Sequence, residues 1–209
     1  MPMTPRAWFL ACLIAVVTIS PAAAAGVPGD AKLVKPRAIG AAAPSFVVRR
    51  EDGLAYAFEP AKLAKPTVLI FYRGGWCPYC NSNLAELRKA ESELERTGFD
   101  MLFLSGDNPE VLRSSLKDPK VTYTLLSDSR MAAARAFGVA FQLDDATYEQ
   151  YKEYGIDLEE ASGETHHQLP VPAVFIVDKS GTIRFVYANP DYKERLKSAD
   201  LLAAARKLN

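Results

Sequence analysis

Two cysteines separated by two residues are the part of the sequence best suited to carry chemistry. Cys77 and Cys80 enclose Pro78 and Tyr79, and Trp76 precedes them. Proline is favoured in the first turn of a helix, so the pattern predicts a helix that begins at this pair. The positive end of that helix would stabilise an exposed Cys77 thiolate, and the second thiol would resolve the mixed disulfide that the thiolate forms. The spacing therefore predicts a redox-active dithiol, with an inert disulfide or half of a metal site as the alternatives.

The composition excludes several other classes of function. The chain has 209 residues, with 25 basic and 25 acidic side chains and a formal net charge of zero. This balance supplies no basic field for nucleic-acid binding. The 3 cysteines are too few for a disulfide-stapled scaffold. The length and the 49% hydrophobic content are typical of one globular domain with an appendage.

Residues 1–25 have the composition of a secretory signal peptide. Ala7–Ile19 is an apolar run of 13 residues after a basic start, and Ala23-x-Ala25 is a small-residue cleavage signature. A membrane span needs about 20 residues, so no stable membrane insertion is expected after cleavage. A lipoprotein signal at Cys12 is the alternative, disfavoured by the short apolar stretch before it. We therefore expect secretion to a bacterial periplasm, where the remaining cysteines meet an oxidising environment.

The elements on either side of the cysteines indicate how the pair is positioned. Thr67–Tyr72 is a continuous apolar run, which is typical of a buried central strand. Pro78–Thr97 carries apolar residues at helical spacing and ends at Gly98. Residues 26–43 mix Gly, Pro, Lys and Ala without a period, and we interpret them as a linker, either a tether or an irregular approach to the domain.

Residues 44–209 alternate between strand and helix patterns, which predicts an α/β domain. We expect a central mixed β-sheet flanked by helices, an N-terminal β-hairpin and an inserted helical segment near residues 141–169, in which an acidic loop follows a polar helix. A surface elaboration and a substrate lid are both open for this segment. The further predicted strands are Ser45–Arg49, Tyr56–Phe58, Phe99–Ser105, Tyr123–Leu126, Pro172–Val177 and Thr182–Tyr187. The further predicted helices are Pro109–Leu116, Arg130–Phe137, Asp145–Tyr154 and Ala199–Lys207.

Several segments resemble those of thioredoxin-fold proteins. The run FYRGGWCPYC at residues 71–80 is similar to their active-site entry, and VPAVFIVDKSGTI at residues 171–183 is similar to their next signature, a strand preceded by proline. TLLSDSRMAAARAFGV and FIVDKSGTIRFVY resemble the peroxiredoxin-like branch of that fold, the alkyl hydroperoxide reductase and thiol-specific antioxidant family. The resemblance covers about Pro44–Asn209 and implies a thioredoxin-like fold. No cofactor is expected.

The resemblance also assigns a role to Pro172. In thioredoxin-like proteins the matching proline is cis and lies against the CxxC, and a cis bond before proline costs little. It would leave the backbone of Val171 free to pair with a substrate strand and would keep metal ions away from the thiols. The alternative is a plain turn before a strand.

Two alignments with the family imply different chemistry. On the disulfide-oxidoreductase pattern, the matching residues are Trp76, Cys77, Cys80 and Pro172, although Phe71 replaces a buried acid. We therefore predict thiol–disulfide exchange with protein or small-molecule thiols and disulfides, which supports cell redox homeostasis and needs an external thiol electron donor. The two residues between the cysteines would influence the reduction potential of the pair.

On the peroxidase pattern, Cys80 falls on the peroxide-attacking cysteine and Cys77 on the residue that orients the peroxide. Arg73 takes the place of the motif's proline, and Pro172 takes the place of the catalytic arginine. Arg73 is then the candidate substitute for the missing charge. Thiol-dependent peroxidase activity on hydroperoxides, with an antioxidant function, is the alternative to disulfide exchange.

His166 and His167 raise a third hypothesis. They lie shortly before the proline-led strand, and two thiolates with an imidazole could bind copper or zinc. A metallochaperone is therefore a further alternative, with an exposed histidine pair in a solvated loop as the competing interpretation. We assign no resident metal. On the inserted helix, Tyr148, Tyr151 and Tyr154 recur every three residues and are expected to pack onto the domain.

Overall fold

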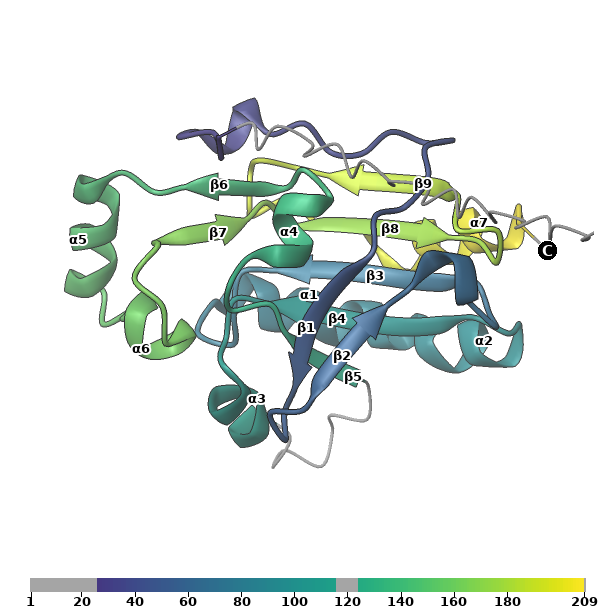
Figure 1. Ribbon diagram of the computed structural model, residues 1–209, viewed down its shortest axis with the longest axis horizontal. Coiled ribbons are helices and arrows are strands. Elements are labelled where there is room, and N and C mark those ends of the chain that lie inside the picture. The colour runs from purple at the N-terminus through teal and green to yellow at the C-terminus, as the bar shows by residue number, and fades with distance from the viewer. Residues whose placement is uncertain (1–25, 116–123, 209) are drawn as a thin grey trace, which may run out of the picture.

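The computed structural model describes residues 26–115 and 124–208 and confirms an α/β fold around a mixed sheet (Figure 1). Its strands are β1 Phe46–Arg50, β2 Ala55–Phe58, β3 Thr67–Tyr72, β4 Asp100–Ser105, β5 Thr124–Ser127, β6 Ala140–Gln142, β7 Gln168–Pro170, β8 Ala173–Val177 and β9 Ile183–Ala188. Its α-helices are α1 Pro78–Leu87, α2 Glu91–Arg96, α3 Pro109–Ser115, α4 Ala132–Ala136, α5 Asp145–Glu153, α6 Leu158–Ser162 and α7 Ser198–Arg206. Its 3₁₀ helices are η1 Ala31–Leu33, η2 Pro60–Lys62 and η3 Arg88–Ala90. Leu116 and Tyr123, the ends of two predicted elements, lie outside the described residues, as does the predicted signal peptide.

The strand that leads to the cysteines, β3, lies in the interior of the main sheet. Among the described residues the sheet has 7 strands in the order β2-β1-β5-β4-β3-β8-β9, and the predicted hairpin is formed by β1 and β2. β3 pairs in parallel with β4 and antiparallel with β8. All of its residues are buried, with Leu69 and Phe71 in one apolar cluster and Val68 and Ile70 in the other. Both faces are therefore covered, which is why the strand has an unbroken apolar sequence.

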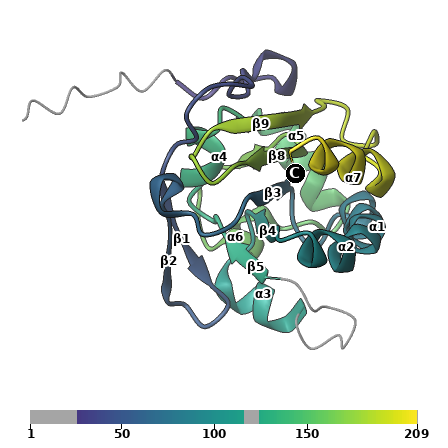
Figure 2. The same ribbon diagram turned by 90° about the vertical axis from the view of Figure 1, so that its right-hand side faces the viewer.

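Two layers cover the sheet, as Figure 2 shows. On one face, α1, α2 and α7 contribute Leu87, Leu94 and Leu201 to a buried cluster. On the other face, α4 packs on the strands. Phe46 and Phe58 of the β1–β2 hairpin, at the edge of the same sheet, join this cluster, and their rings stack with the centres 4.8 Å apart. Burial of these large side chains contributes much of the core's stabilisation. Leu84 and Leu87 of α1 pack in the same cluster as Val68 and Ile70 of β3, which holds the helix against the strand.

The predicted helix over residues 78–97 is present as three consecutive helical segments. α1 passes through η3 into α2, and Gly98 then takes a φ of +85°, a conformation that glycine adopts without strain. Leu87, Ala90 and Leu94 stay buried through the change. Because these apolar positions keep a helical spacing, the sequence pattern does not reveal the tighter 3₁₀ turn.

Residues 26–43 run along the domain as an irregular, hydrogen-bonded approach. Arg37 N donates to Phe137 O over 3.0 Å, and Gly40 N donates to Ile183 O over 2.8 Å. These bonds attach the segment to the end of α4 and to β9. Within the described part of the chain, no helix combines the length and hydrophobicity that a membrane span requires.

The inserted segment forms a unit at the end of the sheet toward which β3 runs (Figure 1). β6 and β7 pair antiparallel, and α5 and α6 lie between them in the chain. The prediction of an acidic loop after the polar helix is wrong in one respect, because α6 lies within that segment. Asp157 caps this helix by accepting hydrogen bonds from Glu159 N at 3.0 Å and Glu160 N at 2.9 Å. The sequence does not reveal α6 because a helix this short shows no hydrophobic period. The small apolar core of the unit consists of Leu143, Tyr148, Leu158 and Leu169.

Candidate active site

The two cysteines lie where β3 ends and α1 begins, as the sequence predicts. Cys77 immediately precedes the helix, Pro78 occupies its first position, and Cys80 lies in the first turn. The Cys80 backbone N–H donates to Cys77 O over 3.0 Å. Both cysteines are free thiols. The local geometry therefore brings the two side chains together at the positive end of a helix.

The burial of both thiols contradicts the expectation of an exposed thiolate. Cys77 is 2% exposed and Cys80 is 1% exposed. The segment between β9 and α7 covers the start of the helix: Arg195 places Nη2 3.5 Å from Cys80 Sγ, and the Tyr192 ring packs against Tyr79 with the ring centres 5.6 Å apart. Tyr79 itself is half exposed at 44%. Because this cover lies 115 residues away in the sequence, no local pattern could reveal it.

A hydrogen bond between the two thiols separates their acidities. The bond from the Cys80 thiol lowers the pKa of Cys77 to about 6 although burial opposes it, and the Cys80 backbone N–H and the charges of Arg73 and Arg195 act in the same direction. The same bond, followed by burial, raises the pKa of Cys80. At neutral pH the pair therefore holds one proton, and the negative charge lies on Cys77.

Arg73 lies in a cage of aromatic rings beside the thiols. Its guanidinium carbon is 4.3 Å from the centre of the Tyr192 ring, 5.0 Å from that of Trp76 and 5.3 Å from that of Tyr151. Nη2 donates a hydrogen bond to Tyr151 Oη. Burial lowers the pKa of Arg73, while the negative charge of the cysteines opposes this effect. The guanidinium remains charged. Arg73 therefore places a buried positive charge near the Cys77 thiolate.

Asp107 is a residue of the site that the sequence patterns did not reveal. It is fully buried, and Oδ2 accepts hydrogen bonds from Gly75 N at 2.8 Å and from Ser105 Oγ at 2.9 Å. Burial raises the pKa of Asp107 to about 6. Within the described residues, Oδ1 has no hydrogen-bond partner. An acid directly after β4, whose Ser105 pairs with Tyr72 of β3, is the signal that could have found it, because the ends of parallel strands adjoin.

The loop between β3 and α1 is closely packed around Gly74. A Cβ at Gly74 would overlap Trp76 Nε1 and would lie 2.7 Å from Asp107 Oδ1, so only glycine fits. The Trp76 ring meets the Tyr151 ring edge-on, with the centres 5.9 Å apart. Cys77 N donates to Gly74 O over 3.1 Å. The packing of the indole thus fixes the loop that presents Cys77.

Two features that the resemblance implies at Pro172, the cis bond and the free backbone N–H before it, are wrong for this chain. None of the described peptide bonds is cis. The Val171 backbone N–H donates to Val139 O over 2.8 Å, so it is not free to pair with a substrate strand. The Val171 N–H is occupied because β6 pairs antiparallel with β7, where Ala140 lies opposite Pro170, and the pairing extends to Val139 and Val171.

A groove of about 330 Å³ opens beside Arg73. Its walls come from the end of β3, from the inserted segment, from the segment after β9 and from residues 29–31 of the N-terminal approach. The apolar and aromatic side chains that line it are Phe141, Leu143, Tyr151, Val171, Pro172, Pro190 and Tyr192. Since the inserted segment supplies one wall, its position favours a role in the site over a surface elaboration.

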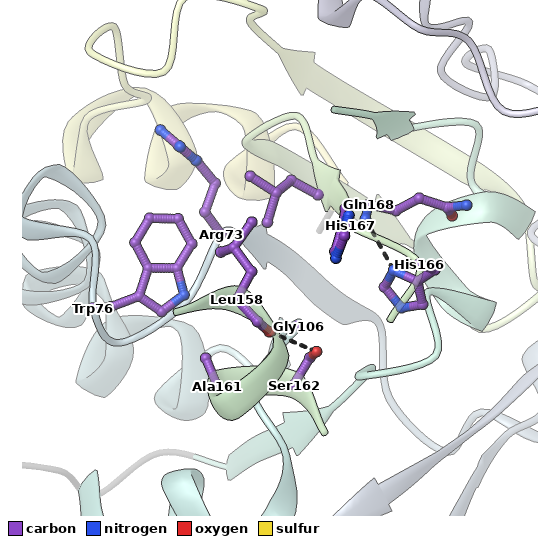
Figure 3. A pocket seen from close by; sticks show the side chains of 10 residues that line it. Arg73, Trp76, Gly106, Leu158, Ala161, Ser162, His166, His167 and Gln168 are labelled. Atoms are coloured by element: carbon purple, nitrogen blue, oxygen red, sulfur yellow. Dashed lines mark hydrogen bonds between the residues drawn. The ribbon is translucent and has the colours of Figure 1, made fainter. Parts of the chain in front are cut away.

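The two histidines lie within the inserted unit. His166 Nε2 is 2.7 Å from Ser129 O, and the His167 ring stacks on Tyr148 with the ring centres 3.7 Å apart. Figure 3 shows both of them across a small pocket from Trp76. In the part of the chain that the structure describes, no group of three or more His, Cys, Asp or Glu side chains is placed to hold a metal ion. The metallochaperone hypothesis therefore gains no support from the histidine positions.

Comparison with known sequences agrees with the resemblance. A family model described as the AhpC/TSA family matches residues 39–186. The putative chloroplastic peroxiredoxin Q of Oryza sativa subsp. indica is 26% identical over 156 residues, which cover 75% of this chain and 61% of that protein. The putative peroxiredoxin bcp of Haemophilus influenzae is 28% identical over 106 residues, which cover 51% of this chain and 68% of that protein. The chain thus spans about three fifths of the length of its plant relatives.

Comparison with solved structures confirms the fold. The crystal structure of peroxidoxin BcpB from Mycobacterium tuberculosis superposes with a TM-score of 0.61 at 19% identity, over 82% of this chain and 97% of that one. The crystal structure of Enterococcus faecalis AhpC superposes with a TM-score of 0.62 at 19% identity, over 81% of this chain and 91% of that one. At this identity the likeness concerns the fold alone.

Proposed function

This chain belongs to the AhpC/TSA family, and from that premise we propose that it is a thiol-dependent peroxidase in which Cys77 attacks a hydroperoxide and Cys80 resolves the product. The sequence predicts thiol–disulfide exchange, with peroxidase activity as the alternative, and the proposal reverses this order. The observation that carries it is the burial of the thiolate, since Cys77 is only 2% exposed. A small oxidant can reach such a sulfur, whereas the disulfide of a folded protein must align both of its sulfurs with the attacking one. The relatives named as peroxiredoxins support the same activity.

The proposed reaction begins with attack of Cys77 Sγ on one oxygen of the hydroperoxide. The S–O bond forms as the O–O bond breaks, and the leaving oxygen takes a proton from solvent, which gives a sulfenic acid and an alcohol or water. The Cys80 thiol then attacks the oxidised sulfur, water leaves, and a disulfide forms. An external thiol donor supplies two electrons and two protons to restore the dithiol. Arg73 and Arg195 stabilise the negative charge on the leaving oxygen.

The attacking sulfur in this proposal differs from the one in the peroxidase alignment. That alignment places Cys80 in the attacking role, but the thiol–thiol hydrogen bond lowers the pKa of Cys77 and raises that of Cys80. The thiolate is the nucleophilic form of cysteine. We therefore assign the attack to Cys77 and the resolving step to Cys80.

Cysteine variants test the proposal. Consumption of hydrogen peroxide with dithiothreitol as reductant is measured beside insulin disulfide reduction, for the wild type, Cys77→Ser and Cys80→Ser. We expect Cys77→Ser to lose peroxide consumption by about a hundredfold or more. We expect Cys80→Ser to form a sulfenic acid on Cys77, which dimedone traps and mass spectrometry locates.

Two outcomes would change the assignment. A sulfenic acid on Cys80 in the Cys77→Ser variant, with peroxide turnover retained, would return the attacking role to Cys80. Insulin reduction without peroxide consumption would replace the peroxidase by thiol–disulfide exchange. Exchange is the second candidate because a low pKa at the first cysteine of a helix-start CxxC also suits that reaction.

The same proposal includes a place of action outside the cytoplasm. The support is the signal-peptide pattern of residues 1–25. The partners would then be hydroperoxides and a thiol reductant of the periplasm. The mass of the protein recovered from a periplasmic extract is expected to match cleavage after Ala25, and retention of the full mass in the cytoplasmic fraction would contradict export.

A further inference from the structure

The inserted segment packs against Trp76 of the reactive loop, and within α5 the side chain of Tyr151 also contacts Arg73. Residues three apart on a helix are offset by about 60° around its axis, so the three tyrosines of α5 and its end point in different directions. Tyr148 is buried in the small core, Tyr151 is half-buried, and Tyr154 is 67% exposed. Of the three, Tyr151 contacts Arg73 and Trp76.

Hydrogen bonds and ring stacking hold α5 in place. Asp144 caps the helix, and its Oδ1 accepts a hydrogen bond from a backbone N–H of the first turn at 2.8 Å. The Tyr148 ring stacks on His167, whose Nε2 lies 2.7 Å from Glu159 Oε1 in α6. These contacts tie α5 to α6 and to the start of β7. The Tyr151 hydroxyl is therefore presented from a braced helix.

The orientation of the Arg73 guanidinium depends on that hydroxyl. Tyr192 and Trp76 offer ring faces, which attract the charge but fix no direction for its N–H groups. Nε is buried without a hydrogen-bond partner, and among the hydrogen bonds of the described residues the acceptor for the guanidinium is Tyr151 Oη. Arg73 also lines the open groove. Without this acceptor, its head could turn into the groove and away from the cysteines.

We propose that Tyr151 is a positioning residue that holds the Arg73 guanidinium beside the Cys77–Cys80 pair, so that the inserted segment sets the reactivity of the dithiol. The expected effect on peroxide turnover rests on the proposed function. Its physical effect acts on the thiolate itself, because a cation held nearby stabilises the ionised sulfur.

The test compares Tyr151→Phe, which removes the hydroxyl and keeps the ring, with Tyr154→Phe at the exposed tyrosine directly after the same helix. The readout is the pH dependence of alkylation by iodoacetamide, with mass spectrometry distinguishing Cys77 from Cys80. We expect Tyr151→Phe to slow Cys77 alkylation about threefold at pH 5, because a guanidinium that is no longer held in place stabilises the ionised sulfur less, and to slow peroxide consumption by a similar factor. Tyr154→Phe should match the wild type.

An Arg73→Met background separates positioning from packing. If Tyr151 acts through the guanidinium, Tyr151→Phe has no further effect on alkylation once the guanidinium is absent. An undiminished effect in that background, or no effect of Tyr151→Phe alone, would overturn the proposal. The Tm of each variant is recorded, and a loss of reactivity at an unchanged Tm supports positioning. Because alkylation requires no peroxide, failure of the peroxidase proposal and failure of the Tyr151 proposal give different results.

Discussion

Replacement of Cys80 by alanine tests how the Cys77 thiolate is stabilised. The hydrogen bond from the Cys80 thiol is the largest of the contributions that bring the pKa of Cys77 to about 6 from an ordinary value of 9.0. Cys80→Ala removes this donor and leaves Arg73 and Arg195 in place. A hydrogen bond to a charged group contributes about 1.5–3 kcal/mol, so its loss lowers the ratio of thiolate to thiol about tenfold or more.

The expected change is largest near the present midpoint. At pH 6 about half of Cys77 is ionised, and a tenfold lower ratio leaves about a tenth. Alkylation of Cys77 by iodoacetamide should therefore slow about fivefold at pH 6 in Cys80→Ala, while the rate at pH 10 stays the same. Cys80→Ser is the matched control, because its hydroxyl can donate the same hydrogen bond and should give a smaller change.

Two results would refute this account of the thiolate. An unchanged pH profile in Cys80→Ala would mean that the arginines and the helix start stabilise Cys77 without the neighbouring thiol. Equal shifts in Cys80→Ala and Cys80→Ser would mean that the lost sulfur matters for packing and not as a hydrogen-bond donor.

Three further variants, one of them a control, test the support beneath the reactive loop. Burial raises the pKa of Asp107 from 3.8 to about 6, so its contribution to folding stability is present below about pH 4 and is lost as the pH rises through about 6. Asp107→Asn should therefore be more stable than the wild type by about 2–3 kcal/mol at pH 8 and by much less at pH 4 in urea unfolding, and an equal difference at both pH values would contradict this. Gly74→Ala should displace Trp76 and slow peroxide consumption about tenfold or more. Gly75→Ala should change activity little because the nearest atom to its added Cβ is 3.6 Å away, and equal effects of the two variants would exclude close packing at Gly74 as the cause.

Local signals were sufficient to place the cysteines in the fold. The apolar run Thr67–Tyr72 is buried on both faces, Pro78 begins the following helix, and Gly98 ends the helical region. Each of these features depends on residues close together in the sequence. The alternation of such elements was enough to predict the sheet, the N-terminal hairpin and the helical insertion.

The surroundings of the thiols could not be predicted because they come from distant segments. Arg195 is 115 residues from Cys80, and Tyr151 is 78 residues from Arg73. Neither residue belongs to a motif that marks it as a partner of the cysteines. The error at Val171 has the same origin, since its N–H donates to Val139 O across the β6–β7 pairing, which the sequence pattern did not show.

The cover of the thiols bears on which oxidant they handle. An ionised sulfur that is almost fully buried is unfavourable unless other groups replace its hydration. The start of a helix is present in any CxxC of this kind, whereas the positive charges of Arg73 and Arg195 are additional in this chain and lower the pKa of Cys77 further. A protein disulfide that docked at the start of α1 would have to move the segment that carries Tyr192 and Arg195 away from Tyr79 and Cys80. That movement would remove part of the charge that keeps the sulfur ionised, so the same cover that stabilises the thiolate favours a small peroxide over a protein substrate.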